Sequence, residues 1–445
     1  MLHTEDIAIR RLLLSGNFGL EKEMLRITPD GHLAQSPHPF SQDEPNITRD
    51  FCEIQVEINT PVFKSVHDAV ECLCDITERI SRKLDGGELL WPFSNPPYIR
   101  CEEEIPVAQF HGSQAWKTDY RNYLSGRYGR YMMTLSGIHF NYSFAGDLLR
   151  RNYEVETGIH MEQGEENVDY RRYESELYLK LAEKLTAYGW VVTVLTAASP
   201  VMDSSFPNAA TGMASVRCSE KGYWNTFTPT FDYSSLEDYV DSIVHYVNNG
   251  SIATPSELYY PVRLKPRGEN TLERLRSYGV NHIELRTIDL NPLNKAGVDE
   301  RDVAFIQLLM VWLASQADIT LTHQQQLQAI SNYHLAAHFS LTDTSVIGVD
   351  GSRQTLADAT VCILDEMAAF YDSLGIDVRA VLDFQKRKIT DSVHCRYADI
   401  IMQKYGSDFV RKALEGISTS KDKNKKRLYF VNSKQYIRKC ANYLE

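Results

Sequence analysis

Four short stretches of the chain alternate between apolar and polar residues with a period of two, the pattern of a strand with one buried face. They span residues 18–27, 51–60, 133–142 and 280–288. Within 51–60, four apolar residues alternate with the polar set Glu53, Gln55, Glu57 and Asn59. The pattern predicts a sheet with one apolar face for the core and one polar face.

The polar face of these strands carries acidic residues two positions apart in the sequence. Glu21 and Glu23 share one face of the first strand, where two carboxylates lie roughly 7 Å apart and repel by about 2 kcal/mol at an effective dielectric of about 20. A single acid there would more often be a solvated edge residue. Repetition of acids on further strands, beside His139, favours divalent cations on this face, because carboxylate oxygens and imidazole suit Mg²⁺ or Mn²⁺.

Apolar residues at helical spacing predict helices among these strands. The expected helices span residues 3–15, 66–84, 172–188, 236–248, 299–318, 355–372, 376–388 and 396–415. Residues 85–106 are rich in Gly and Pro and predict an ordered loop. Because strands and helices do not alternate regularly, we predict an α+β fold with an antiparallel or mixed sheet covered by helices on one face.

Composition narrows the class of protein. A chain of 445 residues predicts one large domain or two, and its net charge of −12 argues against nucleic acid or an anionic membrane as the main partner. Eight cysteines without paired or zinc-type spacing, and no signal-peptide pattern, predict a reducing cytoplasm. The basic run 418–427 predicts a solvated loop, with a docked strand or helix at 428–444.

The chain lacks the common phosphate-binding motifs. Neither a Gly-x-x-x-x-Gly-Lys-Ser/Thr loop nor a Gly-x-Gly-x-x-Gly fingerprint is present, which disfavours a P-loop ATPase and a Rossmann dehydrogenase. The acidic face instead indicates ATP held through divalent ions. Arg263, Lys265 and Arg267 alternate along one extended segment; they predict either an anion site or a solvated basic strand.

Several runs, in the same order along the chain, resemble the bacterial glutamate–cysteine ligases. They are residues 19–26 (GLEKEMLR), 48–51 followed by Glu57 and 60–61, 91–97 (WPFSNPP), 136–141 (SGIHFN), 198–200 and 283–292 (IELRTIDLNP). The resemblance covers roughly residues 17–320. It implies one ligase domain over residues 1–445, with a six-stranded sheet curved into a funnel, a helical C-terminal part at 321–416 and a basic tail at 417–445.

The resemblance also implies roles for individual residues. The metal-binding positions are matched by Glu21, Glu23, Asp50, Glu57, His139 and Glu284. Asp50 is out of step with Glu57, so it must precede the strand or lie at a bend. The catalytic cations are Arg286, Lys265 and Arg263, although Arg286 beside Glu284 is equally consistent with a structural ion pair. Substrate contacts are implied for Arg217, which would hold the α-carboxylate of glutamate, and for Asn141, Phe51, Tyr223 and Tyr259.

The implied reaction joins the γ-carboxylate of glutamate to the amine of cysteine through a γ-glutamyl phosphate, with ATP as co-substrate and Mg²⁺, or Mn²⁺, as the metal. It is the first step of glutathione biosynthesis. Two alternatives stay open: a ligase with another amine acceptor, and a non-catalytic homologue that binds an amino acid or nucleotide. The expected partners are these small molecules, and the oligomeric state is open, a monomer included.

Overall fold

The structure is a computed structural model that describes residues 1–162 and 167–423, with side chains as far as Ile417. An antiparallel sheet lies at its centre, with strands in the order β2-β3-β1-β5-β7-β6. A short seventh strand, β4, pairs with β1 off this path. The strands are β1 Gly16–Ile27, β2 Ile47–Arg49, β3 Gln55–Asn59, β4 Leu89–Leu90, β5 Gly137–Phe144, β6 Val262–Lys265 and β7 His282–Asp289.

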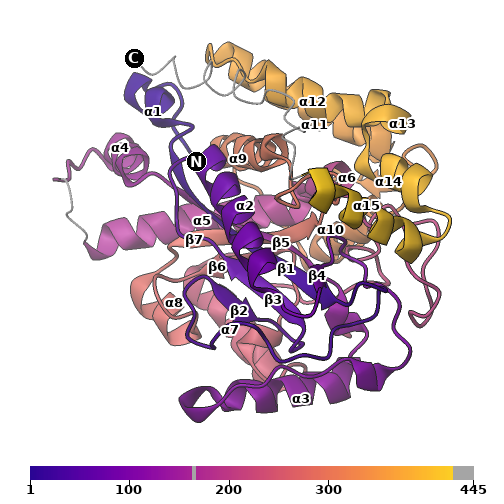
Figure 1. The fold of residues 1–445 in the computed structure, drawn as a ribbon. Coiled ribbons are helices and arrows are strands. Elements are labelled where there is room, and N and C mark those ends of the chain that lie inside the picture. The colour runs from indigo at the N-terminus through magenta and orange to yellow at the C-terminus, as the bar shows by residue number, and fades with distance from the viewer. Residues whose placement is uncertain (163–166, 424–445) are drawn as a thin grey trace.

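Helices lie around this sheet (Figure 1). Two further strands, β8 Ser345–Ile347 and β9 Arg353–Thr355, pair as a small hairpin. The N-terminal helices are α1 Ile7–Leu12, α2 Val66–Lys83, α3 Trp116–Tyr128, α4 Gly146–Thr157, α5 Val168–Tyr188 and α6 Trp190–Thr196. The central ones are α7 Leu236–Asn248, α8 Leu272–Tyr278, α9 Glu300–Ser315 and α10 His323–Ala336. The C-terminal ones are α11 Leu356–Ser373, α12 Arg379–Thr390, α13 Ser392–Cys395, α14 Tyr397–Tyr405 and α15 Phe409–Lys423. The predicted α+β class is confirmed.

The apolar face of the sheet forms the main core. Leu20 of β1, Phe140 of β5 and Leu285 of β7 are almost fully buried and pack in one cluster with residues of α2, α5 and α9. Burial of this face holds the sheet in one register, because a shift by one residue would turn the polar face inward.

A second apolar cluster joins the C-terminal helices to the loop at 85–106. The Trp91 ring lies 5.5 Å from that of Phe409, and Phe93 contacts Tyr405 at 5.1 Å, all measured between ring centroids. Because these aromatic side chains are buried together, α14 and α15 pack directly on the part of the chain that follows β4.

Two predicted strands are shorter than expected. Residues 51–54 form a turn in which Gln55 N donates to Cys52 O, so β3 begins only at Gln55 and Glu53 leaves the polar face to pair with Arg49 at 3.1 Å. In the stretch predicted at 133–142, a 3-10 turn over Met132–Thr134 comes first, so β5 begins only at Gly137. Asp50 lies between β2 and this turn, as its parity required.

Helix predictions were also incomplete. The helix expected at 396–415 is divided by residues 406–408, and α15 continues to Lys423, so the first part of the loop predicted at 418–427 is helical. Residues 424–445, including the segment expected to dock, lie outside the described residues. The prediction missed α3, α4, α6, α8, α10 and α13. Helix α3 buries only Leu124 and α6 is buried on every side, so neither shows an apolar stripe.

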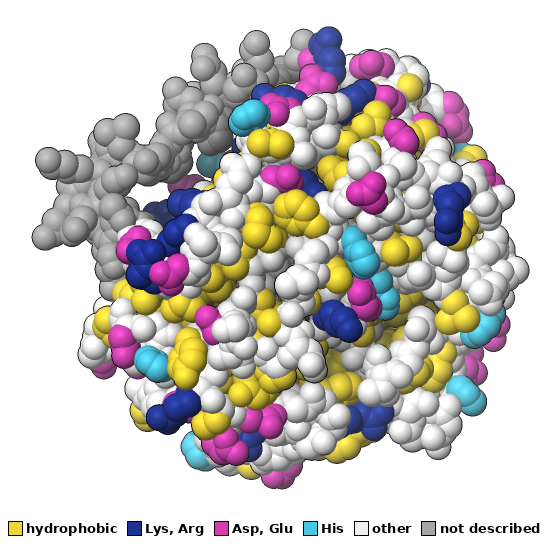
Figure 2. Space-filling model, turned by 90° about the vertical axis from the view of Figure 1, so that its right-hand side faces the viewer, with side chains coloured by type: hydrophobic (Ala, Val, Ile, Leu, Met, Phe, Trp, Pro, Cys, Tyr) yellow, Lys and Arg dark blue, Asp and Glu magenta, His cyan; other side chains and the backbone are white. Residues whose placement is uncertain are grey.

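The surface charge, the cysteines and the helix composition each bear on the sequence predictions. On the face drawn in Figure 2, basic side chains are scattered among acidic ones rather than gathered in one patch of described residues. Seven cysteines lie in the described residues and all are free thiols. Among the described helices, none combines the length and the apolar character that crossing a bilayer requires.

Lys22 is a charged residue on the apolar face of β1, between Leu20 and Met24. It is 3% exposed, and its Nζ donates to Thr77 Oγ1 of α2 at 3.3 Å. Burial lowers the pKa of Lys22 from 10.5 to about 8. Above pH 8 the unfolded chain therefore binds a proton that the folded chain does not, and stability rises with pH up to about 10.5.

We expect Lys22→Met to stabilise the fold by about 3 kcal/mol below pH 8, because the variant no longer buries a cation. The gain should shrink as the pH rises from 8 towards 10.5. Denaturant unfolding at pH 7 and pH 10 measures both values. The exposed Lys83→Met is the control and should show no such slope; an equal gain for Lys22→Met at both pH values would contradict the assignment.

Candidate active site

The polar face of the sheet opens into a cavity of about 230 Å³. All the predicted site residues except Asn141 line it, together with residues of α3 and of two loops. Asn141 lies beside this lining, and its Nδ2 donates to Glu21 Oε1 at 2.9 Å. Residues from distant parts of the sequence are therefore brought together as predicted, while their individual roles stay predictions.

Strand register explains why these side chains meet. Glu23 of β1 lies directly opposite Glu57 of β3, and on the other edge of β1 Glu21 lies opposite His139 of β5. Further across, Glu284 of β7 faces Arg263 of β6. Residues opposite each other in antiparallel strands point to the same face, so the polar side chains form a continuous row across the sheet.

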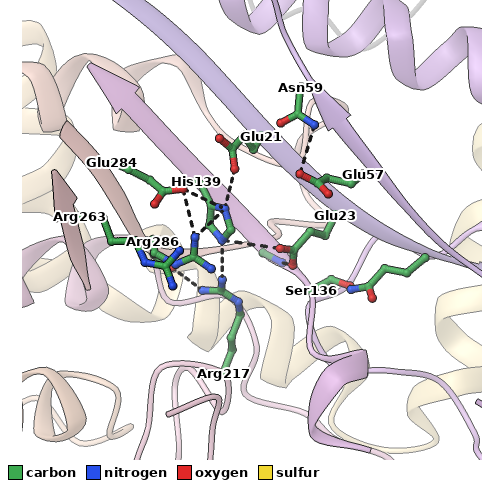
Figure 3. Close-up of polar contacts among 12 residues, drawn as sticks. Glu21, Glu23, Glu57, Asn59, Ser136, His139, Arg217, Arg263, Glu284 and Arg286 are labelled. Atoms are coloured by element: carbon green, nitrogen blue, oxygen red, sulfur yellow. Dashed lines mark hydrogen bonds and ion pairs between the residues drawn. The ribbon is translucent and has the colours of Figure 1, made fainter. Parts of the chain in front are cut away.

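His139 lies at the centre of this row (Figure 3). Its Nδ1 is 2.9 Å from Glu21 Oε2 and 3.8 Å from Glu284 Oε1, and its Nε2 is 3.6 Å from Glu23 Oε1. His139 is buried, and burial together with the positive charge of Arg286 lowers its pKa. The neutral imidazole that results is the form that can bind a metal.

The carboxylates fall into two electrostatic environments. Burial, with the negative charge of Asp50, raises the pKa of Glu23 to about 8, and the same two causes raise that of Glu57 well above its usual value. Burial also acts on Glu284, but Lys265, Arg286 and Arg263 outweigh it and hold its pKa well below the usual range. Cations thus compensate the acids incompletely on the β1–β3 side of the cavity and fully on the β6–β7 side.

The donor atoms fit a divalent cation. One ligand atom each from Glu21, His139 and Glu284 lie within 4.8 Å of one another. Glu23, Asp50 and Glu57 line the same cavity outside this group. Carboxylate oxygens with one imidazole are hard donors of the kind that Mg²⁺ and Mn²⁺ accept. A cation would offset the burial and the repulsion that together raise the pKa values of Glu23 and Glu57.

Cations line the opposite wall. Lys265 Nζ lies 3.3 Å from Glu284 Oε2, and Arg286 Nη1 lies 3.1 Å from Glu284 Oε1. Arg263 donates through Nη2 to the carbonyl oxygens of Ser256 and Leu258, and its buried Nε has no hydrogen-bond partner among the described residues. Arg286 thus forms the ion pair with Glu284 that the sequence allowed, and it also lines the cavity. Its catalytic role stays a prediction.

Arg217 reaches the cavity from the loop between α6 and α7. Its Nη1 donates to the carbonyl oxygen of Arg286 at 2.7 Å, and its buried Nε has no hydrogen-bond partner within residues 1–162 and 167–423. The guanidinium lies directly over Gly137 of β5, where an added Cβ would overlap it. Only glycine at this position leaves room for the arginine, which lines the cavity.

A β-bulge in β7 adds a buried acid that the alternation did not predict. Between the pairs Ile138–Ile288 and Phe140–Leu285 the register shifts by one residue, so Asp289 pairs with Gly137 and shares the face of Glu284 despite opposite parity. Asp289 accepts hydrogen bonds from Ser199 Oγ at 2.7 Å and Ser215 Oγ at 3.0 Å. It therefore anchors the loop that carries Arg217.

Aromatic side chains form the remaining wall. The rings of Tyr223 and Tyr259 lie 4.1 Å apart between centroids, and Phe51 lines the cavity near them. Tyr120 and Arg121 of α3 also line it and were missed, because α3 itself was not predicted. Arg121 donates to the carbonyl oxygens of Asp50 and Arg49, which fixes the turn after β2.

The sequence matches the family description "Glutamate-cysteine ligase" over residues 3–253 and 223–336. The chain belongs to the glutamate–cysteine ligase family. The match includes both halves of the sheet and therefore all the strands that carry the polar face.

Individual relatives agree with this assignment. The chain is 35% identical over 405 residues to a glutathione biosynthesis bifunctional protein of Listeria innocua, covering 86% of this chain and 52% of that protein. A bifunctional glutathione synthetase of Pasteurella multocida aligns with a TM-score of 0.79 at 27% identity, over 95% of this chain and 54% of that one. The chain thus spans about half the length of these bifunctional relatives.

A glutamate–cysteine ligase of Francisella tularensis, solved with AMP, has the same fold. It aligns with a TM-score of 0.80 at 21% identity over 97% of this chain and 93% of that one. The two chains therefore share the sheet and its covering helices.

We expect the protein to bind Mn²⁺, and Glu21→Gln to weaken that binding by roughly tenfold to a hundredfold, because the change removes one charged donor of the Glu21–His139–Glu284 group. Isothermal titration with MnCl₂ measures the affinity. Glu71→Gln removes an exposed acid on α2 and should bind Mn²⁺ like the unaltered protein. Equal affinity in both variants would reject Glu21 as a metal ligand.

Proposed function

We propose that this protein catalyses the ATP-dependent ligation of the γ-carboxylate of L-glutamate to the amine of L-cysteine. The observation that carries the proposal is the convergence, in one cavity, of an acidic metal-binding side, a cationic side and Arg217. Metal, phosphate and carboxylate positions should co-occur in a ligase that activates a carboxylate with ATP.

In the first step, a γ-carboxylate oxygen of glutamate attacks the γ-phosphorus of ATP. A new O–P bond forms, the bond to the β-phosphate breaks, and ADP leaves with the electron pair. Negative charge grows on the transferring oxygens, and Arg286, Lys265 and Arg263 stabilise it from the β6–β7 side. Arg217, which lines the cavity, holds the α-carboxylate of glutamate through its guanidinium, which fixes the distance of the γ-carboxylate from the phosphate.

A divalent metal, Mg²⁺ in our proposal, would be held by Glu21, His139 and Glu284, with Glu23, Asp50 and Glu57 available on the acidic side. When bound, it supplies charge neutralisation to the phosphate oxygens of ATP.

In the second step, the amine nitrogen of cysteine attacks the acyl carbon of γ-glutamyl phosphate. The C–N bond forms, phosphate leaves, and the amine gives up its proton. Phe51, Tyr223 and Tyr259 enclose the acceptor side chain and limit its size, since pocket contacts of this kind discriminate by about 1–3 kcal/mol. The polarity of the cavity makes a purely regulatory homologue the weaker candidate, because the full set of acids and cations is retained.

The direct test measures ADP release with glutamate, ATP and Mg²⁺ and a panel of amines. We expect release to depend on glutamate and to be fastest with cysteine. Faster release with another amine would identify a ligase of different acceptor, and no glutamate-dependent release with any amine would refute the proposal.

Gly137→Ala should raise the KM for glutamate by about tenfold or more, because the new methyl group displaces the Arg217 guanidinium from its position. Steady-state ADP release measures the effect. Gly19→Ala, on the neighbouring strand β1, is the matched control, since its Cβ would lie 3.5 Å from Asn141 Cβ in ordinary contact. The same KM in both variants would show that Arg217 does not hold glutamate.

A further inference from the structure

Glu257 is a wholly buried acid that lies behind the aromatic wall of the cavity rather than in its lining. It ends the 3-10 turn η4, Pro255–Glu257, and its side chain is 0% exposed. A buried carboxylate is costly unless its oxygens are paired, so its partners indicate which segments it holds together.

Both carboxylate oxygens of Glu257 are occupied. Oε1 accepts from Tyr128 Oη at 2.7 Å and pairs with Arg127 Nε at 2.8 Å, both at the end of α3. Oε2 accepts from Ala253 N at 2.7 Å. Burial and the neighbouring Glu257 raise the pKa of Tyr128 to about 12, which keeps its hydroxyl protonated as a donor at neutral pH. The carboxylate thus ties α3 to the turn before β6.

The same contacts continue to the acceptor wall through Asn225. Asn225 Nδ2 donates to Tyr128 Oη at 3.1 Å and to Glu257 O at 2.8 Å, and its Oδ1 accepts from Tyr259 N at 2.8 Å. Asn225 follows Tyr223 by two residues in the chain. The Tyr128 ring packs edge-on against Tyr259 at 5.4 Å, and Tyr259 contacts Tyr223. Two contacts therefore lead from Glu257 through Tyr128 to Tyr259, and a third leads on to Tyr223.

We infer that Glu257 is a positioning residue for the amine acceptor: through Tyr128 and Asn225 it sets the separation of Tyr223 and Tyr259, and hence the fit of the acceptor side chain. The inference rests on the proposed function. It assigns no contact between Glu257 and substrate. Removing its charge should loosen the acceptor side of the cavity and leave the strands that carry Arg217 and the metal-binding acids in place.

The test compares Glu257→Gln with the unaltered protein in steady-state ADP release. We expect the KM for cysteine to rise about tenfold, with the KM for glutamate and the slow ADP release without an amine unchanged. The ratio of kcat/KM for cysteine to that for 2-aminobutyrate, which carries a methyl group in place of the thiol, should fall towards one. Glu269→Gln, an exposed acid in the loop after β6, is the control.

Tyr128→Phe is a second test, because it removes one hydroxyl from the same network. We expect a smaller rise in the KM for cysteine, again with the KM for glutamate unchanged. Unchanged KM and selectivity for the acceptor in both variants would overturn the inference. Equal losses for glutamate, ATP and acceptor, or loss of folding in both variants, would also overturn it in favour of a general structural role. Absence of glutamate-dependent ADP release in the unaltered protein would instead refute the proposed function.

Discussion

Charge compensation on the polar face of one sheet is the constraint on which the rest of the structure depends. Glu23 and Glu57 face each other across β1 and β3 in a buried setting, where the pKa of Glu23 is raised to about 8. Such a pair is unfavourable for a merely structural sheet. On the β7 side, Lys265 and Arg286 compensate Glu284 directly. Compensation by cations is therefore incomplete around Glu23 and Glu57 and direct at Glu284.

The sheet supplies this charge pattern, and other segments convert it into a binding cavity. The loop between α6 and α7 contributes Arg217 and is anchored on Asp289. Helix α3 closes another side and fixes the turn at Asp50 through Arg121. The core helices α2, α5 and α9 pack on the apolar face. The apolar face of the sheet thus carries the core packing, and the polar face carries the contacts of the cavity. Side chains on the polar face can therefore change with little effect on the free energy of unfolding.

Much of the fold and most of the cavity follow from the sequence, because period-two alternation places residues such as Glu21, Glu23 and His139 on one face without knowledge of tertiary contacts. The class of fold, the antiparallel sheet and the membership of the family agree with prediction. The turn at residues 51–54 was missed because it interrupts a perfect alternation through local hydrogen bonds. Helix α3 was missed because it buries one residue, and with it went Tyr120 and Arg121. Glu257 gave no signal, since a lone acid in a loop reads as solvated until its partners are known.

The bulge in β7 separates the strand into two stretches that obey opposite parity rules. Glu284, before the bulge, lines the cavity, and Asp289, after it, anchors the loop that carries Arg217. The backbone pairing of β5 and β7 sets which residues of β7 point to the polar face. Replacing a side chain leaves this pairing intact, whereas inserting or deleting one residue at the bulge would turn the residues beyond it to the opposite face. Point substitutions in β7 therefore change the side chains of the cavity without changing the strand pairing. Among related sequences, insertions and deletions should be rarest at Arg286 and Thr287.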